Sequence, residues 1–391
     1  MMWKASVVVA MALPLASAAL ADFALQTVLD NATPIFGSYE KITGGKAEWM
    51  KSYPDETLLV HMNIPGTHDS ATWNYTQATQ DALRGITDLN QVVVPEPEAL
   101  RCQDSPLIDM LNMGIRAFDL RYAFDPTNST LIFYHSEALL SQTATVNDVL
   151  FGFYQWLDDH PSETIFLSFQ YQSSTALYAS NNAAVQLQLY NILTTAAARH
   201  YFMQTKDELG TLGDSRGKIT LMRRFDLDKL PDSYTAALPG LHFSPSLWTD
   251  NGPAITLEYN TAKSLSAYIE DYYQPLTPTG SSALENIRWK YNATLENIRK
   301  ATSQHPDSLF WTWASSNNIE NNPPDWPRIM ALGNGTDYTP AGGINQQLVP
   351  FLKSQKGKRV GIVMFDFFEQ PSDLIDTFLN LGNTKTRDML A

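Results

Sequence analysis

Short apolar runs recur along the chain and constrain its fold more than any other feature of the sequence. Eight of them are predicted to form strands, at residues 57–63, 115–124, 131–135, 164–171, 218–225, 254–259, 308–314 and 359–367. Many are continuous in Val, Ile, Leu and Phe without strict alternation, which is typical of strands buried on both faces in a parallel sheet. Helical patterns lie between several of them, most clearly at 145–158 and also at 183–202 and 283–302. This alternation predicts either an α/β sheet or a (β/α)8 barrel.

The N-terminus has the pattern of a secretory signal peptide. Lys4 precedes an apolar stretch at 7–20, and Ala19-Leu20-Ala21 fits a small-x-small cleavage site. The stretch is too short and interrupted for a good membrane span, and we find no later transmembrane segment. We therefore expect a signal peptide at 1–21 and one domain at 22–391, because the Pro/Gly/Asn-rich loops at 317–327 and 332–343 resemble surface insertions.

Further features favour a secreted protein. Five N-x-Ser/Thr sequons predict a glycoprotein, at Asn31, Asn74, Asn128, Asn292 and Asn334. Cys102 is the only cysteine, so an intramolecular disulfide is excluded, and no Cys/His cluster has the spacing of a zinc site. We interpret Cys102 as a buried structural residue and not as a reactive thiol.

The net charge of −14 argues against nucleic acid as a partner and against tight electrostatic docking on an anionic membrane. A site that binds phosphate would therefore have to gather its positive charge locally. We expect a monomer that makes at most transient contact with a membrane surface.

Polar residues end several of the predicted strands, where active sites form in α/β barrels. The first run is followed by His68-Asp69, the third ends in His135, the fifth in Arg223-Arg224 and the eighth in Asp366. In the second run, Asp119 and Arg121 are two residues apart and so share one face of a strand. A single strand-end histidine is usually structural, and Asp119 could simply pair with an arginine. Five strands that converge in this way predict an active site instead.

Two histidines, an arginine and supporting aspartates suit phosphodiester chemistry without a metal. One histidine can take a proton from an attacking hydroxyl while the other gives a proton to the leaving oxygen. An arginine stabilises the charge on the phosphoryl oxygens, and each aspartate can orient a histidine or an arginine.

Several segments then resemble a known family in chain order, namely IPGTHDSAT, GIRAFDLRY, FYHS, HPSETIFLSF, RGKITLMRRF and RVGIVMFDF. They are similar to landmarks of the small, secreted, metal-independent phosphatidylinositol-specific phospholipases C. The similarity extends over about residues 57–370, and the sequons favour a fungal member. The resemblance implies a distorted (β/α)8 TIM-type barrel. It also implies cleavage of phosphatidylinositol, and of glycolipid anchors in some members, to diacylglycerol and inositol 1,2-cyclic phosphate.

The resemblance also implies roles for individual residues. His68 matches the general base, with Asp366 as its orienting partner, and His135 matches the general acid, assisted by Asp69. Arg121 matches the phosphate-binding arginine, supported by Asp119. Metal-dependent relatives hold calcium where this arginine stands, so Arg121 implies an enzyme with no metal and no other cofactor.

Headgroup recognition is implied by a second set of matches. Arg224 corresponds to a ring-binding arginine, and Asp271 with Tyr273 corresponds to an Asp-x-Tyr pair that contacts and stacks on inositol. At position 170 the family has a lysine that binds inositol hydroxyls, and here Gln170 can form hydrogen bonds but carries no charge. Trp326 is the expected lipid-surface contact. Two alternatives stay open: a phosphodiesterase for another headgroup, and a catalytically silent secreted binding protein on a barrel scaffold.

Overall fold

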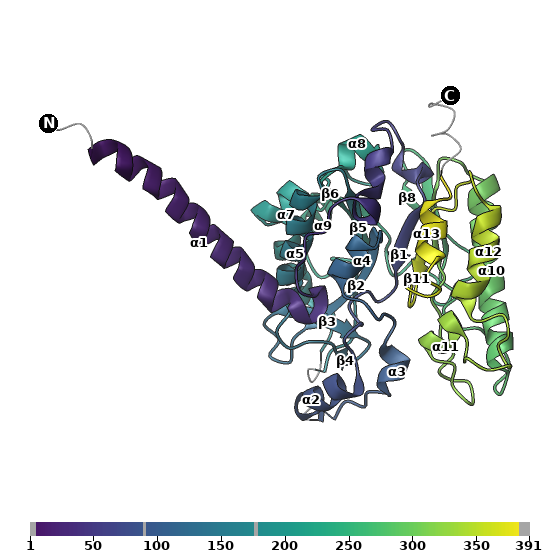
Figure 1. Cartoon of the computed structure of the whole chain (residues 1–391). Helices are drawn as coiled ribbons and strands as arrows, with labels where there is room; N and C mark the ends of the chain where they lie inside the picture. The colour runs from purple at the N-terminus through teal and green to yellow at the C-terminus, as the bar shows by residue number, and fades with distance from the viewer. Residues whose placement is uncertain (1–4, 89–90, 176–178, 383–391) are drawn as a thin grey trace.

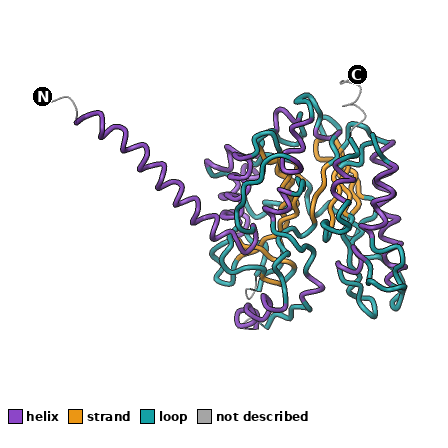
Figure 2. The backbone as a smooth tube through the Cα atoms, in the orientation of Figure 1, coloured by secondary structure: helices purple, strands orange, loops and turns teal. Residues whose placement is uncertain are grey.

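The computed structural model describes residues 5–88, 91–175 and 179–382, and its centre is a sheet curved into a near-closed barrel (Figure 2). Along the barrel wall the strands follow the order β7-β6-β5-β2-β1-β11-β10-β9-β8. Neighbouring strands pair in parallel from β7 to β9, and only β8 is antiparallel to its neighbour β9. This is the distorted barrel that the sequence predicted.

The strand bounds show which predictions were right. The wall consists of β1 (Ile64–Thr67), β2 (Ala117–Phe124), β5 (Thr164–Tyr171), β6 (Lys218–Arg224), β7 (Leu241–His242), β8 (Ile255–Asn260), β9 (Leu265–Glu270), β10 (Leu309–Trp313) and β11 (Ile362–Phe365). The predicted run at 131–135 is β3 (Leu131–His135), but it forms an antiparallel hairpin beside β2 with β4 (Ala138–Leu139). The sequence did not reveal β4, β7 or β9.

The prediction of a first strand at 57–63 was wrong. Leu59–His61 forms a 3-10 turn, η2, and the strand begins only at Ile64, in a segment that contains Pro65 and Gly66. Gly66 is needed there because a Cβ atom at this position would lie 2.8 Å from the carbonyl oxygen of Ala117 on β2 and 2.5 Å from the sulfur of Met364 on β11. Tight packing inside the barrel thus selects a residue that local propensity would exclude from a strand.

Helices surround the barrel (Figure 1). They are α1 (Ala5–Phe36), α2 (Gln77–Thr87), α3 (Pro97–Leu100), α4 (Leu107–Asn112), α5 (Val146–Asp159), α6 (Ala183–Leu193), α7 (Ala196–Tyr201), α8 (Leu212–Ser215), α9 (Asp232–Ala237), α10 (Ala283–Ser303), α11 (Pro327–Leu332), α12 (Ile344–Ser354) and α13 (Leu374–Leu379), with a 3-10 segment, η1 (Gly45–Ser52). The helix predicted at 145–158 is α5, which begins at a capping box between Thr145 and Asp148. The helix predicted at 183–202 is divided, because Thr195 caps a new helix, α7.

Helix α1 extends away from the barrel at its N-terminal end and packs on it at its C-terminal end (Figure 1). Phe36 makes an edge-to-face contact with Phe153 of α5, at a centroid distance of 5.3 Å. The predicted cleavage point after Ala21 falls within this helix, whereas Lys4 lies outside the described residues. Within the described part of the chain, no helix is long and apolar enough to cross a bilayer.

A period of two along the strands separates the barrel interior from the helical layer. Phe118 and Leu120 of β2 belong to the core cluster that includes residues of the surrounding helices, whereas Ala117 belongs to the cluster inside the barrel. Inward positions change from apolar to polar toward the C-terminal ends of the strands: Ala117, Asp119 and Arg121 on β2; Phe166, Ser168 and Gln170 on β5; Met222 and Arg224 on β6; Met364 and then Asp366 after β11. The apolar residues fill the barrel, and the polar ones form its mouth.

A buried ion pair stabilises the opposite end of the barrel. Arg116, just before β2, contacts Glu163, just before β5, with 2.7 Å between Nη2 and Oε2, and both side chains are fully buried. The Arg116 guanidinium also donates to four backbone carbonyl groups and stacks 4.6 Å above the ring of Trp156. Glu163 of the HPSETI segment is therefore a structural residue.

Candidate active site

A cavity of about 610 Å³ opens at the C-terminal ends of the strands. Its lining includes His68, Arg121, His135, Gln170, Arg224, Asp271, Tyr273 and Asp366, all of which the sequence had singled out. Asp69 and Asp119 are 1% and 0% exposed and lie behind Arg121, in contact with its guanidinium. The structure thus brings together all ten of the predicted site residues, which come from seven different strand ends.

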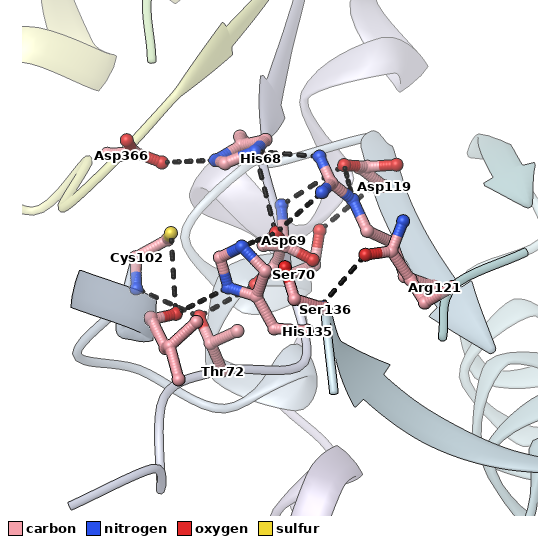
Figure 3. A network of polar contacts seen from close by, with 12 residues as sticks. His68, Asp69, Ser70, Thr72, Cys102, Asp119, Arg121, His135, Ser136 and Asp366 are labelled. Atoms are coloured by element: carbon pink, nitrogen blue, oxygen red, sulfur yellow. Dashed lines mark hydrogen bonds and ion pairs between the residues drawn. The ribbon is translucent and has the colours of Figure 1, made fainter. Parts of the chain in front are cut away.

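His68 is held between an acid and an arginine. Its Nδ1 lies 2.9 Å from Asp366 Oδ1, and its Nε2 lies 2.8 Å from Arg121 Nη2 (Figure 3). Because arginine only donates, His68 Nε2 must accept this hydrogen bond. The ring proton of neutral His68 is therefore on Nδ1, which donates to Asp366. Burial lowers the pKa of His68 well below its usual value, and Arg121 and His135 lower it further. His68 is therefore neutral with a lone pair on Nε2, as a general base requires.

Arg121 joins the site through all three of its nitrogens. Nε contacts Asp119 Oδ2 at 3.0 Å, Nη1 contacts Asp69 Oδ2 at 3.1 Å, and Nη2 reaches His68. Burial alone would lower the pKa of Arg121, but the two carboxylates outweigh burial and raise it. The guanidinium is thus a fixed positive charge at the mouth of the barrel.

His135 and Asp69 share a proton. His135 Nδ1 donates to the carbonyl oxygen of Leu100 at 2.7 Å, which leaves Nε2 of the neutral ring as an acceptor, 3.1 Å from Asp69 Oδ2. Figure 3 shows Asp69 between the two histidines. Burial raises the pKa of Asp69 to about 8 and lowers that of His135 to about 3, so between these values the pair retains one proton. A proton held beside a neutral imidazole is available to a leaving group.

The second half of the cavity is a polar and aromatic subsite. Arg224 Nη2 lies 3.4 Å from Asp271 Oδ2, and its guanidinium stacks 4.0 Å above the ring of Trp248. Trp248 Nε1 donates to the same Asp271 oxygen at 2.7 Å. Gln170 Oε1 is buried and has no hydrogen-bond partner among the described residues, so a ligand donor could satisfy it.

Three contacts of the site were not predicted from the sequence. The carbonyl of Leu100 sets the His135 tautomer, Trp248 supports Arg224 and Asp271, and the Tyr273 hydroxyl donates to Asp250 at 3.0 Å. Leu100, Trp248 and Asp250 do not stand in a motif or at the end of an apolar run, and only the tertiary contacts identify them. Trp326, the expected lipid contact, is half-buried and packs against the core.

One group of side chains combines the atom types of a metal site. Within the described ranges, ligand atoms of His68, Asp69 and Cys102 all lie within 4.8 Å of one another. Two features oppose a cation there: Arg121 already contacts Asp69, and burial with nearby carboxylates raises the pKa of the Cys102 thiol well above its usual value. These residues therefore fit a metal poorly.

Comparison with known proteins relates the chain to phosphatidylinositol-specific phospholipases C. Residues 87–225 match the family described as phosphatidylinositol-specific phospholipase C, X domain. The chain is 27% identical over 323 residues to a 1-phosphatidylinositol phosphodiesterase of Listeria monocytogenes, covering 83% of this chain and 81% of the relative. It is 21% identical over 332 residues to the Staphylococcus aureus (strain Newman) protein of the same name, covering 84% and 90%.

The chain is a homologue of the phosphatidylinositol-specific phospholipases C.

Solved phospholipase C structures share the fold. A Staphylococcus aureus phosphatidylinositol-specific phospholipase C aligns with a TM-score of 0.64 at 19% identity, over 86% of this chain and 98% of the other. The Listeria monocytogenes phospholipase C aligns with a TM-score of 0.59 at 21% identity, over 87% and 100%. The family match at 87–225 includes Asp119, Arg121 and His135, whereas His68 and Asp366 lie outside the matched residues.

Proposed function

We propose that this chain is a metal-independent phosphodiesterase that cleaves phosphatidylinositol to diacylglycerol and inositol 1,2-cyclic phosphate. The observation that carries the proposal is the convergence of two histidine–aspartate pairs and one arginine on a single cavity. The homologues are named 1-phosphatidylinositol phosphodiesterases, which supports this reaction class.

The proposed mechanism follows from the free atoms of the site. The inositol 2-hydroxyl oxygen attacks phosphorus while His68 Nε2 accepts its proton, and the bond from phosphorus to the diacylglycerol oxygen breaks. The proton shared by His135 and Asp69 passes to that oxygen. Arg121 donates to the phosphoryl oxygens, which requires its Nη2 to leave His68 Nε2 as the hydroxyl arrives.

The subsite around Arg224, Asp271 and Gln170 is proposed to bind the inositol hydroxyls. Stacked guanidinium, carboxylate and amide groups are suited to a ring of neutral hydroxyl groups. Because Gln170 lacks the charge of the family lysine, another phosphodiester headgroup is the second candidate. That candidate gains support if a different phosphodiester is turned over and phosphatidylinositol is not.

Apolar side chains near the cavity support transient contact with a lipid surface. Val93 (90% exposed), Leu247 (65%), Leu276 (69%) and Ile319 (46%) are within two residues of cavity-lining positions or line the cavity themselves. Such exposed residues around a site favour a membrane-facing rim. Leu247→Ser together with Leu276→Ser is expected to reduce binding to phosphatidylinositol vesicles, measured by co-sedimentation. The exposed residue Leu187 provides a matched control, Leu187→Ser.

Secretion and glycosylation are part of the same proposal. Asn31, Asn128, Asn292 and Asn334 are exposed and do not line the cavity, whereas Asn74 is half-buried. Glycans at the four exposed positions are thus compatible with substrate access. Mass spectrometry of the secreted protein would locate the cleavage site and any glycans.

The decisive experiment is incubation of the purified protein with phosphatidylinositol in EDTA, followed by phosphorus NMR. The expected product is inositol 1,2-cyclic phosphate. Without turnover of phosphatidylinositol, glycolipid anchors or other phosphodiesters, the chain would be the silent binding protein that the sequence left open.

A further inference from the structure

The His68–Asp366 pair lies where two strands diverge. The last paired residues of β1 and β11 are Thr67 and Phe365, and the last hydrogen bond joins the His68 N–H to the Phe365 carbonyl at 3.1 Å. Beyond it, the Ser70 N–H donates to Asp119 on β2, and Phe367 turns away with a φ of 45°. The side chains of His68 and Asp366 must nevertheless meet at 2.9 Å.

A buried amide joins the two diverging backbones. Gln103, in the loop between α3 and α4, is 0% exposed, and its Nε2 donates to the His68 carbonyl at 2.8 Å and to the Phe365 carbonyl at 2.9 Å. Its two amide hydrogens are thus used on the two strand ends that carry the pair. The same loop is fixed by the Phe367 N–H, which donates to the Cys102 carbonyl at 2.9 Å.

A second buried amide holds the segment that follows β11. Asn345, in the first turn of α12, is 1% exposed, and its Nδ2 lies 2.8 Å from the Asp366 carbonyl, 3.2 Å from that of Phe367 and 3.0 Å from that of Gln370. These contacts fix the backbone at the residue that orients His68. Neither Gln103 nor Asn345 lines the cavity, so neither is placed to touch a substrate.

We propose that Gln103 and Asn345 are positioning residues, which set the distance and orientation of the His68–Asp366 pair from outside the cavity. The inference rests on the proposed function, because it requires His68 to act as the base. A displacement of about 1 Å at a reacting group can cost about 10²-fold in rate. The two amides therefore act on the rate of the chemical step, with no effect on substrate binding.

The test is Gln103→Met, which retains the side-chain length and removes both donors. We expect kcat on phosphatidylinositol to fall about 10- to 100-fold with KM within about threefold, because the interaction lost supports only the reacting geometry. The matched control is Gln186→Met. Gln186 is also buried, and its amide bonds to Asp228 and Lys229 away from the cavity. The control should retain wild-type kcat.

A double-mutant cycle separates positioning from general stabilisation. If Gln103 acts through the pair, Gln103→Met should lower kcat by less than about twofold when Asp366 is already replaced in Asp366→Asn. An equal loss in both backgrounds would overturn the proposal, as would wild-type kcat in a folded Gln103→Met protein.

The outcomes remain distinguishable from failure of the proposed function. If the wild-type protein turns over no phosphodiester, the proposed function fails. If it is active and the variants match it, only the positioning inference fails. Should circular dichroism show that Gln103→Met is unfolded, Asn345→Ser provides the same cycle with Asp366→Asn and the same two outcomes.

Discussion

Replacing Asp69 with asparagine removes the carboxyl group that shares a proton with His135. In the wild-type protein the pair holds one proton between pH values of about 3 and about 8, set by burial of both groups. In Asp69→Asn only His135 can carry this proton, and its Nδ1 hydrogen is committed to the Leu100 carbonyl. With a pKa of about 3, roughly one His135 in 10⁴ would carry a proton on Nε2 at pH 7.

The expected loss of kcat is therefore set by general acid catalysis. Such catalysis contributes about 10²- to 10⁴-fold, so Asp69→Asn should lose activity on phosphatidylinositol within this range. In an inositol phosphodiester whose leaving group is p-nitrophenolate, this group departs as a stable anion and needs no proton from the acid. Cleavage of this substrate, followed by absorbance, should fall far less than cleavage of the lipid.

The comparison of the two substrates tests the reasoning. Asp373→Asn is the matched control, because Asp373 pairs with Lys353 at the surface, at 2.9 Å, away from the cavity. Equal losses of Asp69→Asn on both substrates would refute the assignment of Asp69 to the leaving-group side. Near-normal activity on phosphatidylinositol would refute the shared proton itself.

Three further predictions concern the base, the arginine and the barrel floor. With rising pH, kcat/KM should increase as His68 loses its proton, at a pKa well below 6.5. It should then decrease near pH 8, where the His135–Asp69 pair loses its proton. Activity confined to alkaline pH would contradict the direction of both pKa shifts. Arg121→Lys should lose about 10²- to 10³-fold in kcat on both substrates, because an ammonium cannot replace the three directed contacts of the guanidinium, and full activity would remove Arg121 from the mechanism. Glu163→Gln leaves Arg116 without its charged partner and should lower the free energy of unfolding, measured in urea, by about 3–5 kcal/mol. The kcat of the folded variant should be unchanged. A loss of kcat without a loss of stability would contradict the structural role of Glu163.

The sequence predicted the fold class because buried strands have a local signal. The runs at 131–135 and 164–171 match β3 and β5. A continuous run of apolar residues indicates a strand that is buried on both faces. β9 was missed because Ser266, Ala267 and Tyr268 dilute its pattern, and this strand pairs with the antiparallel edge strand β8. β1 was misplaced because Pro65 and Gly66 resemble a turn, and only the close approach of β2 and β11 makes glycine necessary.

The candidate site was predicted because the active-site residues of α/β barrels lie at the C-terminal ends of the strands. The period of two placed Asp119 and Arg121 on one face, and the structure confirms that both point inward, with Nε 3.0 Å from Oδ2. The exposed apolar residues near the mouth could not be found in the same way, since exposure of Leu247 or Leu276 depends on how loops pack around the mouth.

By itself, the sequence determined which residue types reach the mouth of the barrel, because strand periodicity is a property of neighbouring residues. Only the tertiary structure decided which of them share protons. The partners His68 and Asp366 are 298 positions apart and meet only because β1 pairs with β11 when the barrel closes. The tautomer of His135 depends on a backbone carbonyl, Leu100, that has no sequence signature, and the backbones of His68 and Phe365 are joined by the Gln103 amide from a loop. Proton affinities in this site follow from burial and from these partners, which exist only in the folded chain.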